Sequence, residues 1–62
     1  MKATRSKTKI TFTGISNESQ LEDVTVTADN TKCTYEQSDF STKVVVKGTP
    51  KQLEAFVKKY NS

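Results

Sequence analysis

The 62-residue sequence predicts an α+β fold, in which a four-stranded antiparallel sheet (β-β-β-β-α) carries one C-terminal amphipathic helix packed on one face. Three observations predict this class. Segment 9–13 alternates apolar and polar residues with the period of two that is typical of strands, and segment 42–47 is a valine-rich run expected to form a further strand. Two further alternating segments flank Asp29-Asn30, a pair typical of a two-residue hairpin turn. The C-terminal segment instead spaces its apolar residues three and four apart, which is the repeat of an amphipathic helix.

The chain begins with a segment that predicts no regular structure. Residues 1–8 carry three basic side chains and no acidic one, and we expect them to form a flexible basic N-terminal arm. A single α+β domain is then expected over 9–62, and its first strand is the alternating segment described above. Residues 14–20 are rich in Gly, Ser and Asn, which favours a loop and leaves a single helical turn near Ser16 open.

The middle of the chain predicts a β-hairpin. Segments 23–28 and 31–36 are expected to pair across the turn at 29–30, so that Val26 opposes Cys33 on the apolar face. A shift of the register by one residue would mix apolar and polar side chains on each face. The pattern of apolar and polar residues therefore favours this register over registers shifted by one residue.

The C-terminal part combines a strand with a capped helix. In the strand 42–47, alternate valines face the core and Val45 is left facing out. Thr49 is expected to be the N-cap of the helix, Pro50 its first residue and Gln52 the partner that completes a capping box. The helix then presents one apolar stripe, made of Leu53, Phe56, Val57 and Tyr60.

Few apolar residues are available for the core, because hydrophobic residues make up 32% of the chain. A chain of this length buries roughly 60% of its unfolded surface, so nearly all of them are needed. Self-association is one way for so small a domain to gain stability. The residues assigned to the core are Ile10, Phe12, Ile15, Leu21, Val24, Val26, Ala28, Cys33, Tyr35, Phe40, Val44, Val46, Leu53, Phe56, Val57 and Tyr60.

The composition argues against several classes of function. The chain has no His and one Cys, so we expect no metal site, no activated nucleophile and no internal disulfide. Its two glycines form no phosphate-binding loop, and its carboxylates flank predicted turns rather than forming an acid–base pair. We therefore expect no enzyme, no cofactor and no small-molecule substrate.

The sequence also bears on location. No segment approaches the ~20 apolar residues of a membrane span, and the basic start lacks the apolar run of a secretory signal. A single cysteine without a disulfide partner is typical of a reducing compartment. We expect a cytoplasmic protein with no membrane partner.

The candidate functional surface is the sheet face opposite the helix, which is expected to display lysines and threonines, Thr25 and Thr27 among them. Two functions fit this surface. The first is a non-enzymatic protein-interaction module, such as an accessory or inhibitory factor of a phage or mobile element, whose partner is another protein or a second copy in a homodimer. The alternative is a nucleic-acid-binding module that neutralises phosphates with the basic arm and the sheet-face lysines. The candidate contact residues are Arg5, Lys7, Lys9, Lys32, Lys43, Val45 and Lys47.

Overall fold

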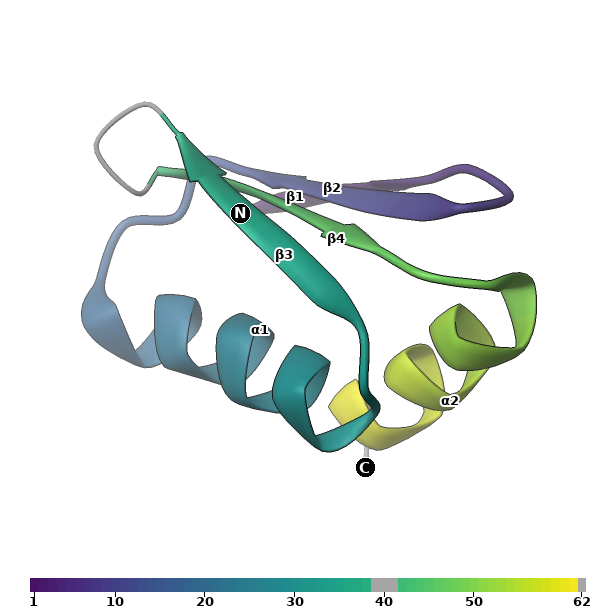
Figure 1. The fold of residues 1–62 in the computed structure, drawn as a ribbon. Helices are drawn as coiled ribbons and strands as arrows, with labels where there is room; N and C mark the ends of the chain where they lie inside the picture. Colours follow the sequence, from purple (N-terminus) through teal and green to yellow (C-terminus); the bar gives the residue numbers. More distant parts are fainter. Residues whose placement is uncertain (39–41, 62) are drawn as a thin grey trace.

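The computed structural model describes residues 1–38 and 42–61, so Phe40, which the sequence assigns to the core, lies outside the described residues. Within this part of the chain, four strands and two helices follow one another as β-β-α-β-β-α (Figure 1). Their bounds are β1 Lys2–Arg5, β2 Lys9–Thr13, α1 Glu18–Asn30, β3 Thr34–Ser38, β4 Lys43–Lys47 and α2 Pro50–Tyr60.

The strands form one antiparallel sheet in the order β1-β2-β4-β3. Because β2 and β3 both run antiparallel to β4, which lies between them, they are parallel to each other. Helix α1 connects these two parallel strands, so β2, α1 and β3 form a split β-α-β unit that β4 completes through the β3–β4 hairpin. The predicted α+β class, four-stranded antiparallel sheet and C-terminal helix are confirmed.

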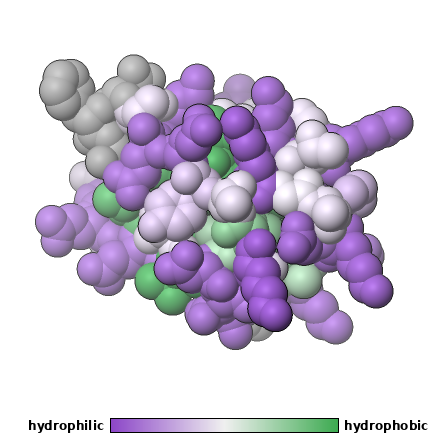
Figure 2. All heavy atoms as spheres, viewed as in Figure 1, coloured by the Kyte–Doolittle hydropathy of each residue, from purple (hydrophilic) through white to green (hydrophobic). Residues whose placement is uncertain are grey.

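Both helices lie on the same side of the sheet and leave the other side uncovered (Figure 1). The central strands β2 and β4 direct their apolar residues to the covered side, where one core forms. Seen from the side, the surface is mostly hydrophilic, and hydrophobic atoms show only in small separate patches (Figure 2). The buried residues, all of them predicted, are Ile10, Phe12, Ile15, Val24, Ala28, Cys33, Val44, Val46, Leu53 and Phe56.

The predicted hairpin over 23–36 is wrong, because residues 18–30 form helix α1. Val24 and Ala28 are four residues apart, so one face of a helix carries both into the core, where each is 0% exposed. Val26, which the hairpin would place in the core, lies on the opposite face of the helix and is 53% exposed. Packing against the sheet therefore overrides the strand propensity of the Val-Thr-Val-Thr run.

The start of α1 lies in the segment predicted as a loop. Asn17 is the N-cap, and its side-chain oxygen accepts a hydrogen bond of 2.9 Å from the Gln20 N–H. The Gln20 side-chain oxygen in turn accepts a hydrogen bond of 2.9 Å from the Ser16 N–H. The polar residues that suggested a loop thus cap a helix.

Thr25 and Thr27, which were expected on the open face of the sheet, lie in α1 instead. Their hydroxyls donate to the carbonyls of Leu21 and Asp23, each four residues earlier in the helix. This bonding within the helix satisfies both hydroxyls and allows β-branched threonines in α1.

The N-terminal segment is not a flexible arm throughout, because Lys2–Arg5 forms β1 beside β2, with Lys2 opposite Thr13. β1 pairs with an edge of β2 that would otherwise expose its N–H and C=O groups. All four residues of β1 are exposed, so hydrophobic alternation gives no sign of this strand. The sheet has the predicted number of strands, but β1 replaces the strand predicted at 23–28.

Helix α1 ends in a Schellman motif whose central residue is a lysine. The Cys33 N–H donates to the Ala28 carbonyl at 2.9 Å, and the Lys32 N–H donates to the Asp29 carbonyl at 3.2 Å. Lys32 has a φ of 61°, the left-handed conformation that glycine adopts most readily at this position. Because the motif occupies residues 31–33, β3 begins only at Thr34.

Helix α2 is capped as the sequence predicts. The Thr49 hydroxyl accepts a hydrogen bond of 3.2 Å from the Gln52 N–H, and the Gln52 side-chain oxygen accepts one of 2.9 Å from the Thr49 N–H. With Pro50 as the first helical residue, this capping box fixes where α2 begins.

Aromatic rings join α2 to β2. The ring centroids of Phe12, Phe56 and Tyr60 lie 5.5 to 5.9 Å apart, within the range of favourable aromatic pairs. Burial raises the pKa of Tyr60 above its ordinary value of 10.0, and the negative charge of Asp23 on α1 raises it further. The two helices are therefore close enough to influence each other electrostatically.

A pair of alanine substitutions tests the orientation of α1. We expect Val24→Ala to lower the free energy of unfolding by about 2 kcal/mol, because it leaves a cavity in the core. Val26→Ala should change it by no more than about 0.5 kcal/mol, in the stabilising direction, because alanine is the better helix former at an exposed position. Urea unfolding followed by circular dichroism measures both values. Equal losses at the two positions would contradict the helix and favour the hairpin.

A second prediction concerns the end of α1. Lys32→Gly should raise the free energy of unfolding by about 1 kcal/mol, because glycine adopts a positive φ without steric cost. Lys32→Ala is the matched control, since it removes the same side chain but keeps a Cβ atom. Thermal unfolding of both variants measures the difference, and equal stabilities would show that residue 32 is not held in the left-handed conformation.

Candidate functional site

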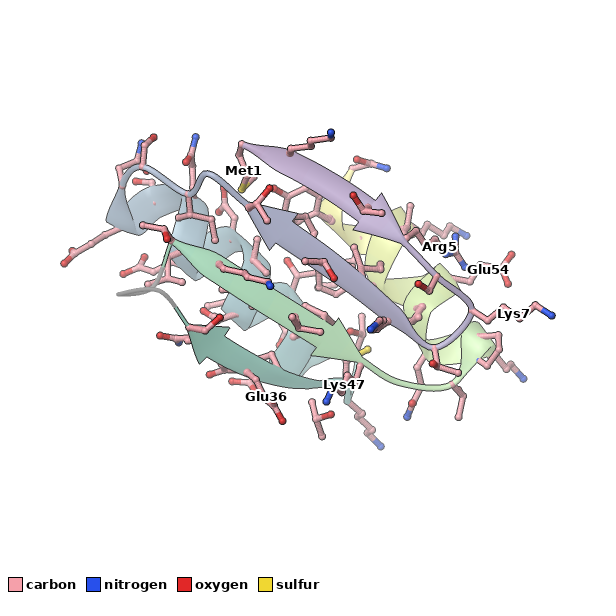
Figure 3. The ribbon with its side chains drawn as sticks, turned by 90° about the horizontal axis from the view of Figure 1, so that it is seen from above. Met1, Arg5, Lys7, Glu36, Lys47 and Glu54 are labelled. Atoms are coloured by element: carbon pink, nitrogen blue, oxygen red, sulfur yellow. The ribbon has the colours of Figure 1, made fainter. Side chains whose placement is uncertain are left out.

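The uncovered side of the sheet, which we call the outer sheet face, is seen from above in Figure 3. Its members follow from the strand register, since each lies between residues that point into the core. Hydroxyl and ammonium groups dominate it. The outer sheet face consists of Lys2, Thr4, Lys9, Thr11, Thr13, Thr34, Glu36, Ser38, Lys43, Val45 and Lys47.

The outer sheet face accounts for the whole net charge of the protein. It carries four lysines and one glutamate, a net charge of +3, which equals the net charge of the chain. The chain has ten basic and seven acidic residues, so six of each remain elsewhere and cancel. This surface is therefore positively charged, while the positive and negative charges on the rest of the molecule cancel.

One ion pair lies on this face. The Lys47 Nζ and a Glu36 carboxylate oxygen are 3.5 Å apart, and the two side chains are 50% and 74% exposed. An exposed pair of this kind contributes at most about 1 kcal/mol and is weakened by salt. Three lysines of the outer sheet face then remain in excess.

Two of the lysines are direct neighbours. Lys9 on β2 and Lys47 on β4 are opposite each other in the register and project from the same face. Like charges at such a position are destabilising, so the arrangement lowers the stability of the sheet unless an anion lies nearby. The pair places two positive charges at this end of the outer sheet face, one of which is in the ion pair with Glu36.

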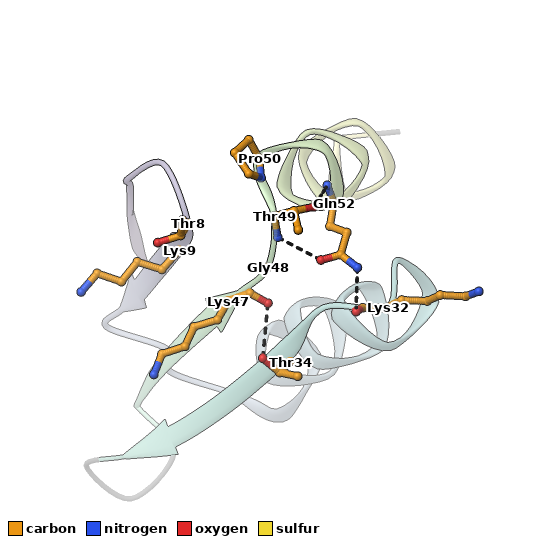
Figure 4. A pocket seen from close by; sticks show the side chains of 9 residues that line it. All are labelled: Thr8, Lys9, Lys32, Thr34, Lys47, Gly48, Thr49, Pro50 and Gln52. Carbon is orange, nitrogen blue, oxygen red and sulfur yellow. Dashed lines mark hydrogen bonds between the residues drawn. The ribbon is translucent and has the colours of Figure 1, made fainter.

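A hollow of about 560 Å³ lies beside this lysine pair (Figure 4). Its lining includes Gly48, where an added Cβ would lie 2.9 Å from the Gln52 Oε1 atom and would displace the Gln52 side chain. Lys32 contributes its carbonyl, which accepts a hydrogen bond of 3.5 Å from Gln52, while its side chain points away from Lys9 and Lys47 (Figure 4). The capping box engages the Thr49 and Gln52 N–H groups, and Pro50 has none. The hollow therefore provides a concave surface beside the lysine pair and adds no further charge to it.

Val45 lies at the centre of the outer sheet face. It is half-buried and faces away from the helices, as the sequence predicts. Thr11 and Glu36 flank it on the neighbouring strands, and Lys43 and Lys47 flank it along β4. The surface therefore has an apolar centre surrounded by polar and charged side chains.

The structure brings together four of the seven candidate contact residues and separates the other three. Lys9, Lys43, Val45 and Lys47 share the outer sheet face. Lys7 lies in the turn between β1 and β2, and Lys32 lies at the end of α1. The remaining candidate, Arg5, is on the helix side of the sheet.

Arg5 is opposite Ile10, whose side chain points into the core, so Arg5 projects toward the helices. It lines a hollow of about 190 Å³ between β1 and α2, together with Phe56 and Tyr60. Arg5, which was expected to contact a partner from the basic N-terminal arm, is therefore separated from the lysines of the outer sheet face. Its place is set by β1, in the segment predicted to be a flexible arm.

Sequence reasoning missed Lys2 and Thr4 on the outer sheet face. Both lie on β1, where Lys2 is opposite Thr13 and Thr4 is opposite Thr11. The signal available was weak, because β1 alternates polar residues with a single alanine. Only its pairing with β2 assigns a side to each residue.

The outer sheet face presents ammonium groups, hydroxyls, one carboxylate and one aliphatic side chain. Cys33 is buried and forms no disulfide, and residues 1–38 and 42–61 contain no group of three or more acidic, His or Cys side chains placed to hold a metal ion. No helix in the same ranges has the length and apolar character needed to cross a membrane. The chemistry that the outer sheet face can supply is charge neutralisation, hydrogen bonding by hydroxyls and burial of one aliphatic side chain.

Comparisons of this chain with protein-family models, with curated proteins and with solved structures find no match.

Proposed function

We propose that the protein is a non-enzymatic protein-interaction module whose outer sheet face binds an acidic surface of a partner protein. The observation that carries this proposal is an uncovered sheet with Val45 at its centre and four lysines around it. Protein interfaces combine a less polar centre with a polar rim, and complementary charge selects the partner and speeds association. The lone buried Cys33 supports a reducing compartment, and we place the module in the cytoplasm.

A nucleic acid is the second candidate ligand, because lysines and threonine hydroxyls can also bind phosphate oxygens. Binding to single strands usually adds aromatic side chains on which bases stack. The outer sheet face contains none, since Phe12, Tyr35, Phe56 and Tyr60 all lie on the helix side. This composition favours an acidic protein over a nucleic acid.

Substitutions at the centre of the face test the proposed function. The tagged protein is used to capture proteins from a cell lysate, with and without nuclease treatment, and the captured proteins are quantified by mass spectrometry. We expect Val45→Glu to lower recovery of a partner at least about tenfold, because it places a like charge against an acidic surface and removes the apolar contact. Lys58→Glu, on the exposed side of α2, is the matched control and should leave recovery unchanged.

Two further measurements decide the outcome of this test. Circular dichroism must show that both variants keep the fold of the wild type. Fluorescence anisotropy with a labelled single-stranded and a labelled double-stranded oligonucleotide, each at two salt concentrations, covers the second candidate. Salt-sensitive binding of either oligonucleotide would overturn the proposal of a protein partner. The proposal would also be overturned if the Val45→Glu variant captured the same proteins as the wild type.

A further inference from the structure

The exposed side of α1 is a second surface of uniform charge. Its seven residues face solvent, and four of them are acidic while none is basic. Val26 lies among them and is one of two large hydrophobic side chains that are at least half exposed in the described part of the chain. This surface, the α1 outward face, consists of Glu18, Ser19, Glu22, Asp23, Val26, Asp29 and Asn30.

Of the acidic side chains of α1, Glu18 alone lies in the first turn, where a negative charge is favourable to the helix dipole. Glu18 and Glu22 are four residues apart, where like charges repel. Asp29 lies in the last turn, next to the negative end of the helix dipole, and that turn contains no basic residue. The ion pair found within residues 1–38 and 42–61, Lys47 with Glu36, involves none of these carboxylates. Their charge is left available for contacts outside the molecule.

The two charged surfaces lie on opposite sides of the protein. Figure 1 shows the sheet and α1 as successive layers, so the outer sheet face and the α1 outward face point in opposite directions. The first has a net charge of +3 and the second of −4. Two outer sheet faces, or two α1 outward faces, would repel each other. A symmetric contact through either surface is therefore disfavoured, and a contact between unlike surfaces is favoured.

The dimensions of the two surfaces also agree. Helix α1 has 13 residues and is about 20 Å long, while four strands about 4.8 Å apart, three of five residues and one of four, present a face of similar extent. Each surface has one aliphatic side chain near its middle, Val26 on the helix and Val45 on the sheet. Docking would place helices on both sides of the sheet, which is a common layered arrangement.

From these observations we infer that the ligand of the outer sheet face is the α1 outward face of a second copy of the same chain. This inference rests on the proposed function and names its partner. The contact is heterologous, so each copy has one free surface of each kind after binding, and association continues head to tail. One helix face buries less than the ~800 Å² per partner of a standard interface, so we expect weak association that salt reverses.

Complementation between two blocked variants tests the inference. Val45→Glu blocks the outer sheet face, and Val26→Lys blocks the α1 outward face by placing a cation among the acids. The wild type should show a sedimentation coefficient that rises with concentration up to about 1 mM at low salt and falls back in high salt. Each variant alone should remain monomeric. An equimolar mixture should form a one-to-one dimer and stop there, because it contains one intact surface of each kind.

The controls exclude simpler explanations. Both variants keep a positive net charge, +2 for Val45→Glu and +4 for Val26→Lys from the +3 of the chain, so their mixing is not driven by opposite net charges. Circular dichroism confirms the fold of each. Lys58→Glu should associate like the wild type.

Several results would overturn the inference. They are a wild type that stays monomeric at low salt, a Val26→Lys variant that associates normally, or two monomeric variants whose mixture also stays monomeric. The proposed function is tested separately. If the wild type is monomeric but Val45→Glu still abolishes capture of a different protein, the outer sheet face remains a protein-binding surface and only the identity of the partner is wrong.

Discussion

The structure depends on packing α1 and α2 against a single side of the sheet. The buried residues of both helices and of β2 and β4 meet in one layer, and the chain has too few apolar residues to build a second. Helix α1 depends on this packing most, because its Val-Thr-Val-Thr run has low helix propensity and its acidic residues repel one another. What holds it in place is the burial of Val24 and Ala28 between sheet and α2, with Asn17 capping one end and the Schellman motif the other.

The same one-sided core produces the surfaces that we assign to binding. Since the apolar side chains are used on the covered side, the other side of the sheet is left with lysines, hydroxyl groups and Val45. The spacing of apolar and polar residues in α1 likewise directs its four acidic side chains toward solvent. A thin core thus gives a small protein two opposite faces of opposite charge.

Much of the fold could be predicted from sequence where one signal was unambiguous. The strand segments around Phe12 and Val45 and the capping box of α2 had no competing interpretation, and the two strands also located Lys9, Lys43 and Lys47 on one face. Residues 23–28 were ambiguous, because Val24 and Ala28 fit both a strand and a helix, and only the three-dimensional packing decides between them. The exposed β1 had no hydrophobic signal, so Lys2 was missed and Arg5 was expected in a flexible arm rather than on the helix side of a strand. The acidic surface of α1 could not be recognised while that segment was interpreted as a hairpin.

The central claim is that residues 18–30 form a helix packed on one side of the sheet. Nuclear magnetic resonance of the labelled protein tests it directly, through Cα chemical shifts and nuclear Overhauser effects between methyl groups. The structure predicts helical shifts throughout 18–30 and contacts from the Val24 methyls to the buried valines of β4, with no such contacts from Val26. Extended shifts over 23–28, with a cross-strand contact between Val26 and Cys33, would contradict it.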